Sequence, residues 1–254
     1  MPRVLSAFIG LMLCASALTP TWAITGNAPP ASGFAAQPIV MVVDPRGDLC
    51  TGTALAPDLV LTAAHCVARP LDYQVKTFQT GQTITVRAIA RHPGFNAASY
   101  AASRATADIA LLKLAAPLAE LVAPAMLAPA RRVAAGETLI VAGFGVTAAG
   151  TAHGLGLPRM AKLAVNGRPG SLQIRLVDLA TRNLRIGLGA CIGDSGAPVY
   201  DGETAQGIGR VIGIVSWSTA PDDEEGCGGL TGVTPLLLYR DWIVDAARKF
   251  GSML

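Results

Sequence analysis

Three short segments of the sequence carry side chains that could together cleave an acyl bond. His65 ends one apolar run, Asp108 begins another, and Ser195 lies among glycines in residues 191–198. A serine hydroxyl is a weak nucleophile that needs a base, and the attacked carbonyl needs hydrogen-bond donors for its developing charge. A histidine can act as the base, a carboxylate can orient it, and the N–H groups of a glycine-rich turn can supply the donors. The three segments therefore indicate a nucleophilic hydrolase.

Taken one at a time, these residues have ordinary structural interpretations as a capped core histidine, a turn carboxylate and a turn serine. Their joint occurrence makes catalysis the stronger interpretation. The other two histidines, His92 and His153, have no comparable neighbours, so we expect both in surface loops. Because the histidines are dispersed and no C-x-x-C pair occurs, we expect no metal site and no cofactor.

The elements that must position these side chains read as short apolar runs separated by Gly, Pro, Asp and Thr. Such runs are typical of an all-β sandwich or barrel, and they cover residues 39–43, 59–62, 82–89, 109–114, 138–142, 173–177 and 211–217. After them, apolar residues recur at helical spacing behind Thr234 and Pro235, which suit an N-cap and a first helical turn. We therefore expect strands followed by one amphipathic C-terminal helix over about 235–250.

The composition and the first residues favour a folded, exported protein. Hydrophobic residues make up 51% of the 254 residues, and a net charge of +3 with scattered basic residues gives no sign of nucleic-acid binding. Residues 1–23 combine a basic start, an apolar stretch and small residues, which is typical of a secretory signal peptide. A membrane anchor is the alternative, but a spanning helix needs roughly 20 apolar residues and this stretch has about 15. We expect a monomer secreted to the periplasm or the exterior, without membrane attachment after signal removal.

In the order His, Asp, Ser, the three segments resemble the signature blocks of the chymotrypsin-like serine proteases. Residues 143–145 resemble the family's Gly-Trp-Gly, residues 213–217 resemble its substrate-binding strand, and residues 231–234 resemble the segment before its final helix. The resemblance thus spreads over the whole mature chain. It implies two antiparallel six-stranded β-barrels, over about 24–122 and 123–234, with the active site between them and a C-terminal α-helix.

The resemblance also implies a role for each residue of the site in cutting protein or peptide substrates. Ser195 would attack the peptide carbonyl, His65 would take its proton and deliver it to the leaving amine, and Asp108 would hold the imidazole tautomer. The backbone N–H groups of Gly193 and Ser195 would form the oxyanion hole. In such sites, losing the correct tautomer costs about 10⁴ in kcat, and losing one oxyanion donor costs roughly 10²–10³.

If Cys14 leaves with the signal, four of the five cysteines remain, and an even number in a secreted chain suggests two disulfides. Three pairings are possible on sequence grounds alone. The family's pairing implies two bonds, Cys50–Cys66 beside the histidine and Cys191–Cys227 beside the substrate pocket. The loop in which some relatives bind calcium falls near residues 76–87, which contain no Asp or Glu, so we expect no calcium site there.

The resemblance further locates the primary specificity pocket. Family members that select Arg or Lys carry Asp six residues before the serine, where this chain has Gly189. We therefore expect a neutral, apolar or small residue at the cleaved position, because burying a substrate cation without a counter-charge is costly. Ser218 replaces the glycine usual on the pocket wall, and its strand would pair with an extended substrate. The residues expected to bind substrate are Gly189, Ser216, Trp217, Ser218 and Gly232.

Residues 24–27, with the sequence Ile-Thr-Gly-Asn, resemble the new N-terminus that folds inward when family members are activated. They follow the expected signal cleavage after Ala23. We hypothesise that the Ile24 ammonium pairs with Asp194, so that signal removal itself completes the active site. The alternative is cleavage after Ala17, which would leave a short pro-segment.

Two other functions are compatible with this sequence. The chain could be an inactive relative that binds proteins, although none of the three catalytic residues is replaced. It could be an esterase with the same triad, although the serine turn is not the G-x-S-x-G motif of α/β-hydrolases. The acidic run at residues 222–225 could attract a basic residue elsewhere in the substrate, but such a run is usually a solvated loop.

Overall fold

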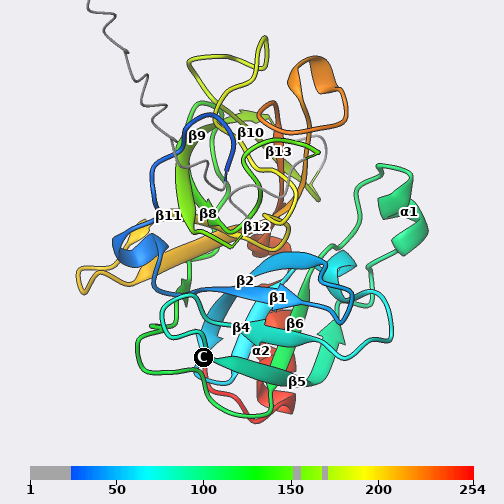
Figure 1. Cartoon of the computed structure of the whole chain (residues 1–254), viewed down its shortest axis with the longest axis vertical. Helices are drawn as coiled ribbons and strands as arrows, with labels where there is room; N and C mark the ends of the chain where they lie inside the picture. Colours follow the sequence, from blue (N-terminus) through cyan, green and yellow to red (C-terminus); the bar gives the residue numbers. More distant parts are fainter. Residues whose placement is uncertain (1–23, 151–155, 168–170) are drawn as a thin grey trace, which may run out of the picture.

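The computed structural model describes residues 24–150, 156–167 and 171–254, so the expected signal peptide and His153 lie outside the described residues. A first β-barrel forms the lower half of Figure 1. Its antiparallel strands close in the order β1-β2-β3-β6-β5-β4. They are β1 (Ile39–Val43), β2 (Leu49–Ala56), β3 (Leu59–Thr62), β4 (Gln74–Lys76), β5 (Thr83–Arg91) and β6 (Ala110–Leu114).

A second barrel stands above the first in the same view. Its strands are β8 (Thr138–Gly143), β9 (Arg159–Gly167), β10 (Ile174–Val177), β11 (Pro198–Glu203), β12 (Gly209–Ser218) and β13 (Thr231–Pro235). They run in the order β11-β8-β9-β10-β13-β12, and pairing of β11 with β12 closes the ring. The short strand β7 (Met126–Leu127) adds to β12 in parallel. The predicted fold of two six-stranded barrels is confirmed.

Strands β1, β3 and β6 of the first barrel read as nearly continuous apolar runs because both of their faces are largely buried. Side chains alternate across a strand, so neighbours on β1 enter different clusters. Val40 and Val42 fill the interior of the first barrel, whereas Ile39 joins the cluster between the barrels. On β3, Val60 faces inward and Leu61 faces the second barrel in the same way.

One apolar cluster joins the two barrels to the C-terminal helix. It includes Leu59 and Ile109 from the first barrel, Phe144 and Tyr200 from the second, and Ile243 from the helix, all fully buried. At about 25 cal/mol per Å² of apolar surface, burial of side chains this large is the main force that holds the barrels together. The surface between them is therefore rigid enough to carry a site.

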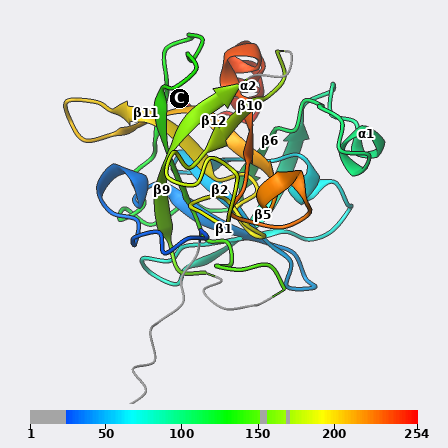
Figure 2. The same ribbon diagram turned by 90° about the horizontal axis from the view of Figure 1, so that it is seen from above.

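The C-terminal helix begins later than the N-cap residues predicted from the sequence. Pro235 is the last residue of β13, and residues Leu236–Leu238 form a 3-10 turn before α2 (Arg240–Lys249). Pairing of β13 with β12 holds Thr234 and Pro235 in extended backbone, which overrides their suitability as helix starters. Seen from above, α2 lies near the edge of the molecule (Figure 2).

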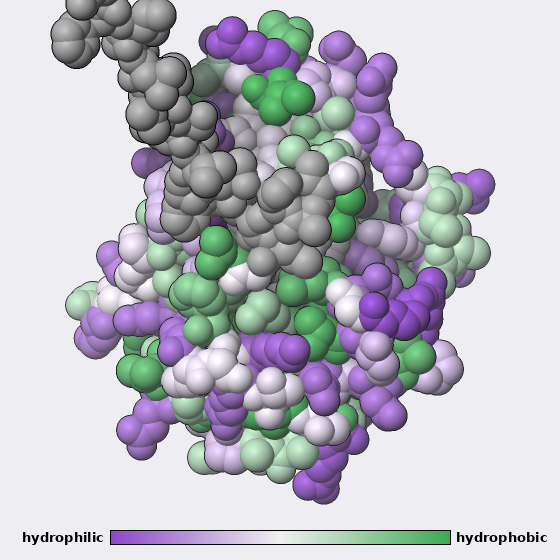
Figure 3. Space-filling model, viewed as in Figure 1, coloured by the Kyte–Doolittle hydropathy of each residue, from purple (hydrophilic) through white to green (hydrophobic). Residues whose placement is uncertain are grey.

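The remaining short elements are α1 (Ala97–Ala101) and the 3-10 turns Gly33–Ala35, His65–Val67 and Pro221–Asp223. The α1 helix projects from the side of the molecule in Figures 1 and 3. Among the described residues, no helix combines the length and apolar character needed to cross a membrane.

Candidate active site

His65 and Asp108 meet at one end of the first barrel because their strands pair. β3 and β6 are antiparallel with Thr62 opposite Ala110, so the residues after β3 lie beside those before β6. The Nδ1 atom of His65 lies 2.8 Å from Oδ2 of Asp108, and the backbone N–H of His65 donates to Oδ1 at 2.9 Å. The carboxylate is only 1% exposed. Since a carboxylate accepts, Nδ1 carries the proton of the neutral ring and Nε2 is left as the basic nitrogen.

The second barrel adds a third donor to this carboxylate. The hydroxyl of Ser216, on β12, donates to Oδ2 of Asp108 at 2.5 Å. Ser216 was expected to contact substrate through its backbone, and its side chain also fixes the carboxylate from the opposite barrel. The resulting orientation of the imidazole thus depends on both halves of the chain.

Ser195 lies next to the histidine across the Cys50–Cys66 disulfide. Its carbonyl oxygen accepts from the Thr51 N–H at 2.9 Å and lies 3.8 Å from the Cys66 sulfur, which in turn lies 3.7 Å from Nε2 of His65. Within the described residues, no hydrogen bond joins that Nε2 to the Ser195 hydroxyl. Such contacts are often long before substrate binds. His65 and Ser195 therefore both lie beside the Cys66 sulfur, and Asp108 is bonded to His65.

The turn before Ser195 presents two backbone donors. The N–H groups of Gly193 and Ser195 have no acceptor among the residues that the structure describes, whereas the carbonyl of Gly193 accepts from the Thr51 hydroxyl at 2.8 Å. That hydroxyl accepts in turn from the Phe144 N–H at 3.1 Å. Gly193 has a φ of 96°, in the region that favours glycine. Thr51 therefore fixes the orientation of this turn, a role that the sequence motifs do not indicate.

Asp194 is fully buried beneath the same turn. Its carboxyl accepts from the N–H of Gly145 at 2.8 Å and from that of Cys191 at 2.9 Å. A Cβ on Gly143 or Gly145 would lie 2.2 Å or 2.6 Å from carboxyl atoms of Asp194, which explains why both positions are glycine. Burial raises the pKa of this carboxyl to about 7, because the two N–H donors do not replace the water it loses.

The segment around Ile24 is inserted close to the predicted pocket. Ile24 is fully buried, and the N–H of the next residue, Thr25, donates to the carbonyl of Gly189 at 3.1 Å. In the 254-residue chain the nitrogen of Ile24 belongs to a peptide bond. Among the described residues, no cation forms an ion pair with Asp194.

Two of the residues expected to line the specificity pocket, Gly189 and Gly232, each pack closely against another residue. Gly189 packs against Gly228, because a Cβ on Gly189 would lie 3.1 Å from the Cα of Gly228. Gly232 faces the ring of Trp217, since a Cβ there would lie 2.0 Å from the indole. Because neighbouring residues of a strand point to opposite faces, Thr231, next to Gly232 on β13, points away from Trp217. Its hydroxyl accepts a hydrogen bond from the Ala190 N–H at 2.9 Å. Thr231 is thus the β13 side chain beside Ala190.

A recess of about 670 Å³ lies between α1 and the second barrel, and Figure 3 shows the surface hollowed beside the projecting helix. It is lined by Tyr100 on one side and by Trp217 and Ser218 on the other. The acidic residues Asp223, Glu224 and Glu225 border the same recess, so part of the acidic run lies near the strand expected to hold substrate.

Both disulfides have the pairing that the resemblance implies. Cys50 is bonded to Cys66 and Cys191 to Cys227, which confirms that prediction. His65 lies near the first pair, but a sulfur in a disulfide is not a thiolate ligand. His92 makes edge contacts with the rings of Tyr239 and Trp242.

Several known proteins are similar to this chain in sequence. The family model described as Trypsin matches residues 25–243. Kallikrein-15 of Homo sapiens is 28% identical over 239 residues, covering 84% of this chain and 87% of the relative. Kallikrein-11 of Homo sapiens is 31% identical, with 79% and 72% covered, and the vitellin-degrading protease of Bombyx mori is 30% identical, with 76% and 74% covered. The chain therefore belongs to the trypsin family of serine-type endopeptidases.

Proposed function

We propose that the protein is a secreted endopeptidase in which Ser195, His65 and Asp108 form the catalytic triad. The observation that carries this proposal is the buried contact of 2.8 Å between His65 Nδ1 and Asp108 Oδ2. An isolated charge this deeply buried would be unfavourable, so its three hydrogen-bond donors are what make it tolerable. Their arrangement leaves Nε2 of the imidazole free to act as a base.

In the proposed reaction, Nε2 of His65 takes the hydroxyl proton while Ser195 Oγ forms a bond to the peptide carbonyl carbon. The carbonyl oxygen becomes an oxyanion and accepts hydrogen bonds from the backbone N–H groups of Gly193 and Ser195. His65 then gives the proton to the leaving amine as the peptide bond breaks. Water, activated by the same nitrogen, attacks the acyl-enzyme and releases the second product.

The decisive test compares the wild type with Ser195→Ala on casein. We expect hydrolysis by the wild type and its loss in the variant, whereas Ser32→Ala, at an exposed serine outside the site, should retain activity. A wild type that binds casein without cutting it would establish the binding-protein alternative. Cleavage of simple esters with no cleavage of any peptide would establish the esterase alternative.

We also propose that the enzyme prefers substrates with an uncharged residue at the cleaved position. The support is that Gly189 and Ala190 bring no carboxylate to the pocket, and the Thr231 hydroxyl is the polar side chain bonded beside them. A substrate cation would there lose water without gaining a counter-charge. A peptide series varied at this one position tests the preference, and strong selection of Arg or Lys would contradict it.

Export and activation complete the proposal. We infer that residues 1–23 are removed as a signal peptide and that the new Ile24 ammonium pairs with Asp194. The burial of both residues and the anchoring of Thr25 on Gly189 support this inference. N-terminal sequencing of the active secreted protein tests it, because any start other than Ile24 would exclude direct activation by signal removal.

A further inference from the structure

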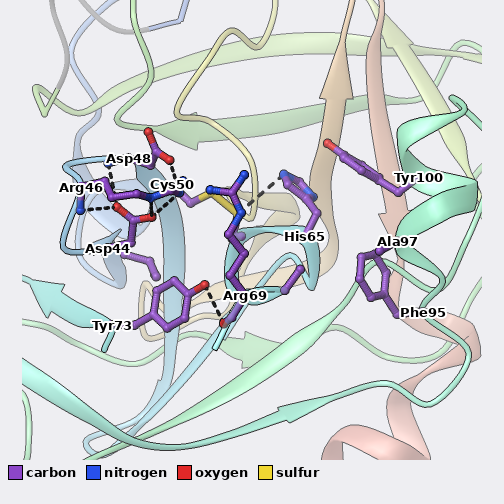
Figure 4. Close-up of a pocket in the computed structure, with 13 residues that line it drawn as sticks. Asp44, Arg46, Asp48, Cys50, His65, Arg69, Tyr73, Phe95, Ala97 and Tyr100 are labelled. Carbon is purple, nitrogen blue, oxygen red and sulfur yellow. Dashed lines mark hydrogen bonds and ion pairs between the residues drawn. A yellow bond between two sulfur atoms is a disulfide. The ribbon is translucent and has the colours of Figure 1, made fainter. Parts of the chain in front are cut away.

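Tyr100 contacts the proposed catalytic base from outside both barrels. It extends from α1 toward His65 (Figure 4), and the two rings stack with centroids 4.3 Å apart and planes inclined by 12°. The ring of Tyr100 borders both the recess beside Trp217 and a second cavity of about 340 Å³, which His65 also lines. It therefore covers one face of the imidazole between two open regions.

The hydroxyl of Tyr100 closes a ring of contacts that includes the buried carboxylate of Asp108. It donates to the carbonyl oxygen of Ser216 at 3.2 Å. The side chain of that serine donates to Asp108, which binds His65, and His65 stacks on Tyr100. Burial raises the pKa of the phenol above its ordinary value of 10.0, so the hydroxyl keeps its proton at neutral pH. Each of the four residues thus restrains the next.

The segment that carries Tyr100 has its own anchors. The side chain of Asn96 caps α1 by accepting from the Ser99 N–H at 2.8 Å. The backbone N–H of Asn96 donates to the Thr106 hydroxyl at 2.7 Å, which ties the two ends of the segment together. Such anchors limit the movement of Tyr100, as positioning of another side chain requires.

We propose that Tyr100 is a positioning residue that fixes the plane of the His65 imidazole and excludes water from one of its faces. This inference rests on the proposed function, since it assigns His65 the role of base. Tyr100 itself takes no proton and forms no bond in the reaction. Its contribution lies in keeping Nε2 directed toward Ser195 while Nδ1 stays bonded to Asp108.

Two variants separate the ring from the hydroxyl. Tyr100→Leu removes both contacts and is expected to lower kcat about tenfold, whereas Tyr100→Phe keeps the stacking and is expected to lower kcat about threefold. Tyr73→Phe is the matched control, because Tyr73 lines the same cavity and also donates its hydroxyl to a backbone carbonyl, that of Arg69 at 3.1 Å. The control is expected to keep the wild-type kcat.

The assay uses an ester of a single blocked amino acid, which occupies only the cleaved position and does not extend along β12. A positioning role lowers kcat on this substrate and leaves KM within about twofold, whereas a role in substrate contact lowers activity on long peptides alone. The low-field proton resonance of His65 Nδ1–H gives a second readout, and we expect it to broaden in Tyr100→Leu because water reaches the ring.

The outcomes are distinct. An unchanged kcat on the ester, or an effect confined to long peptides, in a folded Tyr100→Leu variant overturns the positioning role while the proposed function stands. A wild type that cleaves neither ester nor peptide and leaves Ser195 unreactive toward a sulfonyl fluoride overturns the proposed function, and the role of Tyr100 falls with it.

Discussion

The buried carboxyl of Asp194 makes stability depend on pH in a way that reveals its partner. Without a partner cation its pKa in the folded chain is about 7, against an ordinary value of 3.8. Between about pH 4 and pH 7 the folded chain then holds a proton that the unfolded chain has lost, so the free energy of unfolding falls as pH rises. A difference of about 3 between the two pKa values corresponds to about 4 kcal/mol over that range.

An Ile24 ammonium beside Asp194 would stabilise the carboxylate and lower its folded pKa, so most of this fall would disappear. The measurement compares two chains that both carry Ser195→Ala, one beginning at Ile24 and the other at Ala23. Urea unfolding at pH 4 to 7 should show a steep decline for the Ala23 chain and a shallow one for the Ile24 chain. Asp194→Asn in the Ala23 chain should abolish the contribution of this group. Equal pH slopes in the first two chains would refute the pairing.

Three further changes follow from contacts of the site. Ser216→Ala removes a hydrogen bond to a carboxylate and should lower kcat roughly 10- to 100-fold with little change in KM, measured on a short peptide. Gly145→Ala places a Cβ 2.6 Å from the Asp194 carboxyl, so activity and thermal stability should both fall, and wild-type values would contradict the packing described. Replacing both Cys50 and Cys66 by Ala opens a loop with a sequence separation of 16 and should cost about 3 kcal/mol in urea unfolding, with the fold retained.

Local motifs predicted the fold, and they marked His65 and Asp108, which the structure brings together, because each motif encodes a strand end or a glycine turn. His65 and Asp108 follow and precede apolar runs whose pairing brings them together. The helix boundary was wrong at Pro235, since the residue types suit a helix start but the pairing of β13 with β12 decides the conformation. The helix-start preference of two residues contributes less free energy than their hydrogen bonds and packing within a sheet of several strands.

The residues missed by sequence reasoning act through contacts between distant parts of the chain. Thr51 and Gly193 are 142 residues apart, and Tyr100 and Ser216 are 116 apart. Threonine and tyrosine in loops and strands have many ordinary roles, so nothing in their local sequence marks them. The alternation of side chains along β13, which puts Thr231 beside Ala190, could be found only once the register was known.

The bonds made by Thr51 have a consequence for how the protein can be divided. The Thr51 hydroxyl of the first barrel holds the turn that carries Ser195 in the second, and the Phe144 N–H donates to the same hydroxyl oxygen. Of two fragments cut between β6 and β7, one would carry Thr51, His65 and Asp108, and the other would carry Ser195 in a turn that lacks the Thr51 hydroxyl. Each fragment should therefore be inert when separate. When mixed, the two fragments would regain peptidase activity only by associating. The split protein could therefore serve as a reporter in which activity measures the association of the two barrels.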